Sequence, residues 1–309
     1  MNLLSIADFS KDDIQSLIKE AIKIKNRPRS YQNKLKNKTL LLFFELPSLR
    51  TRLSFETAIH QLGGHSIFYH ADKSLWKLKE SIEDTAKNCS LFSDIVTLRL
   101  VKHDDIDTFS RNATVPVINA LTDMYHPCQI LSDLQTIIEH KNKLEGLKLA
   151  YIGDSNNNIT HSLLLACSMF GIDMSIACPK LKAYYPQKIV LDKAKSYSKN
   201  SRNSKSKIEI TTDPILAAKN ADIIYTDSWM SYSIPKSEQK KREKVLGKYK
   251  VNNKVMQSAK KDAIFMHCLP ALRGKEVTAE VIDGKQSVVF KQAENRLHMQ
   301  KAILLKLLK

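Results

Sequence analysis

The sequence predicts an α/β protein with two lobes, each a mainly parallel sheet with helices on both faces. Short apolar runs that end in turn residues alternate with helical patterns along the chain, and this alternation is typical of parallel sheets covered by helices. The alternation begins again after Gly146, and 309 residues are more than one hydrophobic core usually serves. We therefore predict a first lobe over residues 1–135, a second over 136–290, and a C-terminal helical segment, 291–309, that packs back on the first lobe.

The first half opens with a predicted helix after Ser10, because apolar residues recur there at helical spacing from Ile14 to Ile24. Apolar runs and helical patterns then follow one another, and a long helix near the middle of the chain marks the hinge between the lobes. The further elements predicted in this half are a strand over Thr39–Phe44, a helix over Ser48–Leu62 that stops at Gly63 and Gly64, a strand over Ile95–Leu98, and a helix over Ile130–His140.

The second half repeats the same order of strand and helix after Gly146. Its short strands are bounded by polar turns, and its last segment is amphipathic and helical. The elements predicted here are a strand over Leu147–Ile152, a helix over Thr160–Phe170 that ends at Gly171, strands over Met174–Ala177, Asp222–Tyr225 and Ala263–Met266, and a final helix over Glu294–Leu308.

The composition is that of an ordinary globular protein, with 43% hydrophobic and 26% charged residues. No unbroken apolar run is longer than Leu40–Phe44, which is far shorter than the roughly 20 residues that a membrane helix needs. The N-terminus has no basic region before an apolar stretch, and acidic residues follow early at Asp8, Asp12 and Asp13. We therefore expect no membrane segment and no targeting peptide, and a cytoplasmic protein.

The chain is strongly basic, with 49 Lys and Arg against 32 Asp and Glu and a net charge of +17. Such a charge is typical of proteins that bind nucleic acid, an anionic membrane surface or anionic substrates. The lysines are scattered, and the densest cluster, residues 236–244, also contains Glu238 and Glu243. This pattern favours a solvated surface and no nucleic-acid binding. The five cysteines are never spaced as CxxC, so they are interpreted as free thiols, without a disulfide framework or a zinc site.

The segment from Phe43 to Arg52 predicts an anion site. A strand ends there, Pro47 turns the chain, and Ser48 stands at the N-cap position of a long helix. The unpaired backbone N–H groups of a helix N-terminus, together with hydroxyls and guanidinium groups, suit a phosphate. Basic residues in a first helical turn oppose the helix dipole unless an anion is bound there. The alternative is a capped helix whose first turn happens to be basic.

Four further polar motifs lie next to predicted strands or helix starts, where ligands bind in open α/β sheets. Three of them also have a structural alternative: a lone His is more often structural, successive Asn residues can form a plain turn, and Cys268 alone is more often a buried inert thiol. The segment Ile152–Asn158 contains Gly153 but is not a GxGxxG fingerprint, which argues against dinucleotide binding. The motifs are Tyr125–Gln129, Ile152–Asn158, Thr226–Ser233 and Met266–Pro270.

Three of these motifs together resemble the aspartate/ornithine carbamoyltransferase family, and the resemblance runs nearly end to end, from Ile6 to Arg296. Within the family, the HCLP motif and the D-x-W-x-S loop resemble the ornithine branch, whereas the aspartate branch has HPLP and a basic loop. The resemblance implies transfer of the carbamoyl group of carbamoyl phosphate to the δ-amine of L-ornithine, which gives L-citrulline and phosphate, without a metal or an organic cofactor. The motifs are Ser48-Leu49-Arg50-Thr51-Arg52, His126-Pro127-Cys128-Gln129 and His267-Cys268-Leu269-Pro270.

The resemblance also implies roles for individual residues. Residues 1–135 would bind carbamoyl phosphate and residues 136–290 ornithine, with closure of the lobes excluding water. Arg99, Thr51 and His126 would meet the carbonyl oxygen, where donors are worth about 3 kcal/mol each. The implied catalytic residues are Arg99, His126, Asp227 and Cys268. The implied substrate-binding residues are Ser48, the backbone of Leu49, Arg50, Thr51, Arg99, His126, Gln129 and Arg296 for carbamoyl phosphate, and Asn158, Asp227, Ser231, Tyr232, Cys268 and the carbonyl of Leu269 for ornithine.

The chain departs from the family pattern at three places. The ornithine loop of the family has Ser-Met-Gly where this chain has Ser231-Tyr232-Ser233, and loss of Gly removes easy access to positive φ. Leu49 replaces the usual Thr or Met, a change that costs little if the residue acts through its N–H. Leu75 stands where relatives often place Gln, in a loop that matches the family's segment reaching into the neighbouring subunit's site.

Several alternatives stay open at this point. The altered 231–233 loop could serve another amine, such as putrescine or N-acetylornithine. A relative that only binds would be expected to have a damaged phosphate motif or to lack His126, and both are intact. The family further implies a homotrimer with active sites shared between subunits. The sequence leaves open whether the reaction serves synthesis or breakdown, and whether trimers assemble further.

Overall fold

The computed structural model describes residues 1–71, 76–200, 206–230 and 234–308. The chain divides into two compact units. Unit 1 comprises Met1–Gln135 and Glu294–Lys309, and unit 2 comprises Thr136–Ala293. The division falls inside helix α5, Pro127–Lys141. Each unit contains one sheet in which all strand pairs are parallel.

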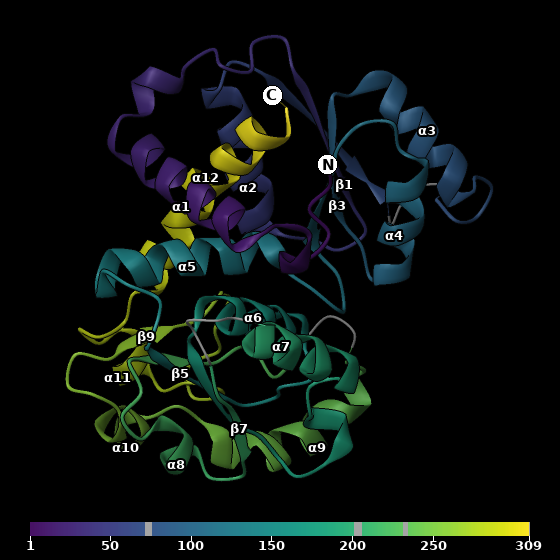
Figure 1. Cartoon of the computed structure of the whole chain (residues 1–309). Helices are drawn as coiled ribbons and strands as arrows, with labels where there is room; N and C mark the ends of the chain where they lie inside the picture. The colour runs from purple at the N-terminus through teal and green to yellow at the C-terminus, as the bar shows by residue number, and fades with distance from the viewer. Residues whose placement is uncertain (72–75, 201–205, 231–233, 309) are drawn as a thin grey trace. The chain divides into compact units, whose positions relative to one another are not determined.

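The sheet of unit 1 has four strands in the order β2-β1-β3-β4. In Figure 1, α3 and α4 lie on one side of β1 and β3, and α1, α2 and α12 lie on the other. The strands are β1 Thr39–Phe44, β2 His65–His70, β3 Ile95–Arg99 and β4 Val117–Leu121. The helices are α1 Lys11–Asn26, α2 Leu49–Gln61, α3 Ile82–Phe92, α4 His103–Asn112, the first part of α5, and most of α12 Val289–Leu307.

Local sequence signals fix where the helices of unit 1 begin. Ser10 and Asp13 form a capping box at the start of α1, and the hydroxyl of Ser48 accepts the Thr51 N–H at the start of α2. Such side chains satisfy N–H groups that have no partner inside the helix. Along α12, Lys301 donates to Gln61 at the end of α2, and Lys306 donates to Asp13 in α1.

The sheet of unit 2 has five strands in the order β7-β6-β5-β8-β9. Helices α6 and α7 lie on one side of it and α8 and α10 on the other (Figure 1). The strands are β5 Lys148–Ile152, β6 Asp173–Ala177, β7 Ile208–Thr211, β8 Ile223–Tyr225 and β9 Ile264–Met266. The helices are the end of α5, α6 Asn158–Phe170, α7 Lys188–Asn200, α8 Pro214–Ala218, α9 Lys236–Leu246, α10 Asn253–Ser258, α11 Ala279–Ile282 and the start of α12.

The predicted fold class is confirmed, and each predicted element is present within a few residues of its expected bounds. The last helix is an exception, because it begins at Val289 rather than Glu294. The pattern did not reveal β2, whose side chains are largely exposed, or β7, which is short and only partly buried. Strand β4 was also missed, because buried Asn119 interrupts its apolar run.

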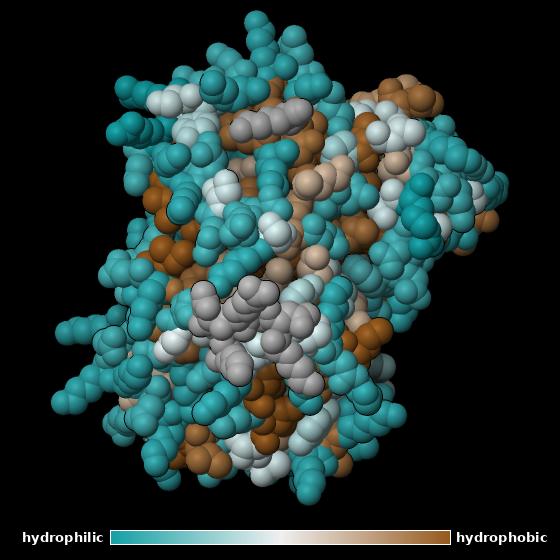
Figure 2. Space-filling view, viewed as in Figure 1, coloured by the Kyte–Doolittle hydropathy of each residue, from teal (hydrophilic) through white to brown (hydrophobic). Residues whose placement is uncertain are grey.

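The central strands are apolar and buried, as expected for a parallel sheet covered on both faces. Every residue of β3, β8 and β9 is buried. Figure 2 shows one face of the molecule, on which hydrophilic residues predominate. Among the described residues, no helix is both long enough and apolar enough to cross a membrane.

Candidate active site

The predicted phosphate motif lies where β1 leads into α2. Ser48 has extended backbone angles and caps α2, so the N–H groups of its first turn point out of the helix end. Thr51 is buried and Ser48 and Arg50 are partly buried, whereas the side chain of Leu49 is 69% exposed. The helix N-terminus, with its hydroxyls and Arg50, therefore has the composition of an anion site. The exposure of Leu49 fits a residue that acts through its backbone.

A buried cluster of cationic and polar side chains lies in the same unit. Arg99 ends β3 and is 4% exposed, and His126 precedes α5 and is 5% exposed. Burial lowers the pKa of His126 well below its usual range, and the charges of Arg296 and Arg99 lower it further. His126 is therefore neutral near pH 7, and one ring N–H can donate a hydrogen bond to a carbonyl oxygen while the ring stays uncharged.

Arg296 connects three helices of unit 1. Its guanidinium group, 3% exposed, donates from Nη1 to Gln129 Oε1 at 2.7 Å and from Nη2 to Thr51 Oγ1 at 3.3 Å. Gln129 in turn donates from Nε2 to Asp133 Oδ1 at 2.8 Å. Hydrogen bonds of Arg296 thus bring Thr51 and Gln129 together. Arg99 and Arg296 also lie close enough to His126 for their charges to lower the pKa of its imidazole. Polar side chains held in this way are already oriented before a ligand arrives.

In unit 2, Asp227 and Cys268 lie at the carboxyl ends of the neighbouring strands β8 and β9. The Cys268 thiol donates from Sγ to Asp227 Oδ1 at 3.0 Å, and the Ser228 N–H donates to the same oxygen at 2.8 Å. Both side chains are partly buried. The register of β8 and β9 explains the pairing. Tyr225 stands opposite Met266, and Asp227 and Cys268 each follow two positions later.

The asparagines after β5 have different positions. Asn157 caps α6 by accepting the Thr160 N–H, and its amide donates to the Tyr151 hydroxyl at 2.9 Å. Asn158 is the first residue of α6 and is partly buried. Asn157 therefore builds the turn, which leaves Asn158 as the candidate ligand. Ser231, Tyr232 and Ser233 of the predicted ornithine loop lie outside the described residues, as does Leu75.

Sequence reasoning missed a buried ion pair beside this half of the site. Arg242 had been assigned to a cluster interpreted as solvated surface, but it is 8% exposed, which corrects that interpretation. Its guanidinium group pairs with Asp154, and its Nε donates to the carbonyl of Trp229 at 3.1 Å. The pair holds the loops after β5 and β8 together. An arginine among lysines was the only available signal, since Arg suits buried pairs better than Lys.

Asp227, His267 and Cys268 place one potential metal ligand each within 4.8 Å of one another. The imidazole of His267 is already engaged, because Nδ1 accepts the Leu269 N–H at 2.9 Å and Nε2 faces Glu276 Oε1 at 3.5 Å. A metal would have to break that arrangement to reach either nitrogen. The contacts of His267 therefore disfavour a metal at this group.

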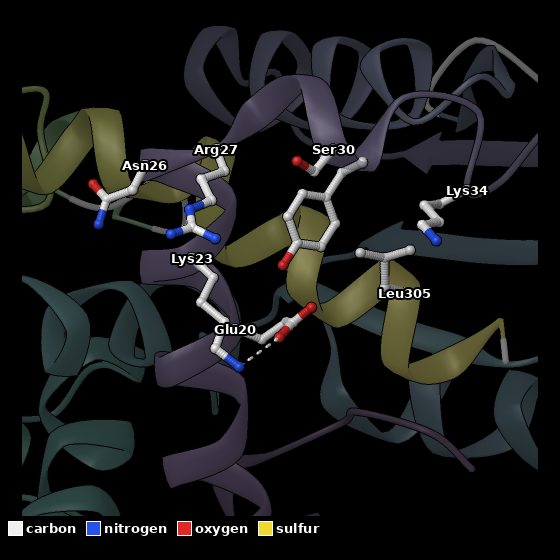
Figure 3. A pocket seen from close by; sticks show the side chains of 8 residues that line it. Glu20, Lys23, Asn26, Arg27, Ser30, Lys34 and Leu305 are labelled. Atoms are coloured by element: carbon white, nitrogen blue, oxygen red, sulfur yellow. Dashed lines mark ion pairs between the residues drawn. The ribbon is translucent and has the colours of Figure 1, made fainter.

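A hollow of about 670 Å³ lies in unit 1. Charged, polar and apolar side chains of α1, the following turn and α12 line it (Figure 3). Lys23 at its edge forms an ion pair with Glu20 at 3.9 Å. The lining contains no residue of the phosphate motif, the Arg296 cluster or the amine motifs, so the hollow is not part of the candidate site. Its lining residues are Glu20, Lys23, Asn26, Arg27, Ser30, Tyr31, Lys34 and Leu305.

Comparison with known families matches two domains along the chain. Residues 1–139 match the aspartate/ornithine carbamoyltransferase carbamoyl-P binding domain, and residues 145–307 match the Asp/Orn binding domain of the same family. The chain belongs to the aspartate/ornithine carbamoyltransferase family. The resemblance inferred from the three motifs is thereby confirmed, and the phosphate motif and the Asp227–Cys268 pair fall in different domains of a carbamoyltransferase.

Individual carbamoyltransferases match along nearly the whole chain. The ornithine carbamoyltransferase of Oceanobacillus iheyensis is 49% identical over 98% of this chain and 92% of its own length. That of Methanococcus aeolicus is 46% identical over 98% of both chains. Among solved structures, the ornithine carbamoyltransferase of Pyrococcus furiosus superposes with a TM-score of 0.92 at 41% identity, covering 98% of this chain and 95% of the other.

Proposed function

We propose that this carbamoyltransferase uses carbamoyl phosphate and L-ornithine and releases L-citrulline and phosphate. The observation that carries the choice of amine is the Asp227–Cys268 pair at the ends of β8 and β9. The Asp227 carboxylate attracts a substrate amine, which the thiol can also contact, whereas the carboxylate would repel the second carboxylate of aspartate. The names of the relatives support the same choice, since each of the two matched above is an ornithine carbamoyltransferase.

Carbamoyl phosphate would occupy the site in unit 1. We assign its phosphate to Ser48, Arg50 and the N–H groups of the first turn of α2. Its carbonyl oxygen would face the buried donors Arg99, His126 and Arg296, of which Arg296 is already held by its hydrogen bond to Gln129. Donors of this kind stabilise the negative charge that develops on the oxygen as the tetrahedral species forms.

The amine would be held by residues of unit 2, with Asn158 and Ser231 toward the α-substituents and Asp227, Cys268 and the Leu269 carbonyl toward the δ-nitrogen. The δ-nitrogen lone pair attacks the carbonyl carbon, the carbon–oxygen bond to phosphate breaks, and the nitrogen loses a proton. Attack requires the neutral amine, but an alkyl amine with a pKa of about 10.4 is almost wholly protonated at pH 7. We assign the first deprotonation, which generates the neutral amine, to the Asp227 carboxylate, and the proton lost after attack to the departing phosphate.

Three parts of the proposal go beyond the family assignment. We infer a homotrimer with sites shared between subunits, a cytoplasmic location, and a role in arginine metabolism, and all three stay predictions. Size-exclusion chromatography with light scattering tests the first. Mixing two inactive variants in one assembly tests whether sites are shared. If each variant has lost the residues that a different subunit contributes to the site, the mixed assembly would contain some intact sites and regain activity.

Parallel assays with several amines test the proposed substrate. Carbamoyl phosphate is supplied with ornithine, putrescine, N-acetylornithine, lysine or aspartate, and citrulline-type products are measured. We expect ornithine to be preferred by about a hundredfold in kcat/KM, which is roughly 2.7 kcal/mol of discrimination. Preference for another amine would overturn the ornithine assignment and make the 231–233 loop the specificity determinant. Binding of carbamoyl phosphate without any turnover would overturn the enzymatic proposal.

A further inference from the structure

Two buried titratable side chains of unit 2, His267 and Glu276, have no part in the reaction described above. We propose that they are positioning residues, which hold the backbone of Leu269 so that its carbonyl group and the Cys268 thiol face the amine. The amine's identity rests on the proposed function. The positioning itself rests on contacts inside unit 2.

The backbone of Leu269 needs to be held, because its φ of 59° lies in the left-handed region. A residue with a Cβ atom adopts this conformation at a cost, so something in its surroundings has to fix it. The Leu269 N–H donates to Nδ1 of His267 at 2.9 Å. This bond spans two residues and fixes the orientation of the peptide groups that flank Cys268.

The backbone of His267 is itself fixed. Its N–H donates to Gln292 Oε1 at 3.0 Å, and Gln292 Nε2 donates to the Tyr225 hydroxyl at 3.1 Å. All three side chains are fully buried, with 0% exposure. Tyr225 ends β8, two residues before Asp227. The chain of bonds therefore relates the end of β9 to the end of β8, where the thiol meets the carboxylate.

Glu276 faces the other nitrogen of the His267 ring. Nδ1 accepts the Leu269 N–H, which selects the tautomer with its N–H at Nε2, and Nε2 lies 3.5 Å from Glu276 Oε1. A carboxylate there favours that tautomer. The same oxygen accepts the Leu272 N–H at 2.6 Å. Glu276 thus acts on both the imidazole and the loop that follows Leu269.

Two near-isosteric substitutions separate this role from simple packing. In His267→Asn the amide oxygen takes the place of Nδ1, so the acceptor for the Leu269 N–H is kept. In His267→Gln the amide reaches toward Glu276, and the acceptor near Leu269 is lost. We expect kcat/KM for ornithine to stay within about threefold of wild type in His267→Asn and to fall about 100-fold in His267→Gln, a loss typical of a small misplacement of reacting groups.

The affinity for carbamoyl phosphate provides the internal control, because its proposed ligands lie in unit 1. Its Kd, measured by calorimetry with carbamoyl phosphate alone, should be the same in both variants. Equal losses of kcat/KM for ornithine in His267→Asn and His267→Gln, or no loss in either variant, would overturn the proposal. If His267→Gln does not fold, Glu276→Gln and Glu276→Leu replace the pair: a loss confined to the leucine variant supports the proposal, and equal losses refute it.

Alkylation of Cys268 by iodoacetamide gives a second readout that needs no turnover. Peptide mapping distinguishes it from the other cysteines, of which Cys128, Cys167 and Cys178 are buried. We expect His267→Gln to change the alkylation rate about tenfold and His267→Asn to leave it unchanged, since reactivity follows the thiol's surroundings. If the wild-type protein carbamoylates no ornithine, the proposed function fails, whereas the alkylation rates still decide whether His267 positions the thiol.

Discussion

The carbamoyl-phosphate half and the amine half of the proposed site are built from different kinds of structure. In unit 1, side chains on α2, α5 and α12 are tied to one another by Arg296. In unit 2, the residues stand in loops after β5, β8 and β9, and a buried ion pair and a thiol–carboxylate contact hold those loops. Helix termini supply aligned N–H groups and suit a phosphate, whereas strand-end loops can vary and suit the substrate that distinguishes family members.

The largest expected effect is on the stability of the amine half. Arg242→Met leaves Asp154 buried without its cation, which typically costs about 3–5 kcal/mol, and urea unfolding with unit 2 probes should show it. The matched control is Arg273→Met, which breaks an exposed pair with Asp283 and should change stability little. The double variant Arg242→Met/Asp154→Asn should recover part of the loss. A single variant as stable as wild type would show that the pair does not hold these loops.

The next effect concerns catalysis by the carbamoyl-phosphate half. Arg296→Met removes the donor that reaches Gln129 and Thr51, and we expect kcat to fall about 100- to 1000-fold, as for loss of one oxyanion donor. Steady-state assays with saturating ornithine measure it. Arg111→Met, on the exposed face of α4 in the same unit, serves as control and should be unchanged. A fall of the same size in both variants would count against a specific role.

The acid sensitivity of the carbamoyl-phosphate half should depend on His126. Its pKa is lowered in the folded protein, so the unfolded state binds the proton more readily once the pH falls below about 6.5. The contribution of this residue to the free energy of unfolding is thus complete above that pH and is lost as the pH falls further. The total loss is about 1.4 kcal/mol for each unit by which folding lowers the pKa. Denaturation from neutral to acid pH should show a shallower decline in His126→Gln than in His60→Gln, which changes an exposed histidine. Identical slopes would contradict the prediction.

The smallest effects separate capping from ligand binding within unit 1. Ser10 and Ser48 both cap helices, and replacing either by Ala should cost about 1 kcal/mol of stability. Only Ser48→Ala should also raise the KM for carbamoyl phosphate. If Ser10→Ala raised that KM equally, the phosphate assignment at α2 would lose its support. Thermal unfolding and initial-rate assays measure the two quantities.

The elements that the sequence predicted are those with strong local signals. Thr39–Phe44 is an uninterrupted apolar run, and the helix ending at Gly171 has its glycine in the left-handed conformation. Strand β2 escaped detection because an edge strand with exposed side chains has no strong apolar pattern. The motifs at strand ends were visible in the sequence, because ligand-binding residues gather there in parallel sheets.

Sequence by itself therefore determined the α/β class and the family and supplied the candidate site residues, since all of these depend on local patterns and motif spelling. Tertiary structure decided which side chains are partners. Arg296 meets Thr51 across 245 positions, and Arg242 meets Asp154 across 88. No local pattern records such pairs, because they depend on how the chain returns to itself. Burial then decides their consequences, since a charge or an imidazole removed from water must be neutral or paired.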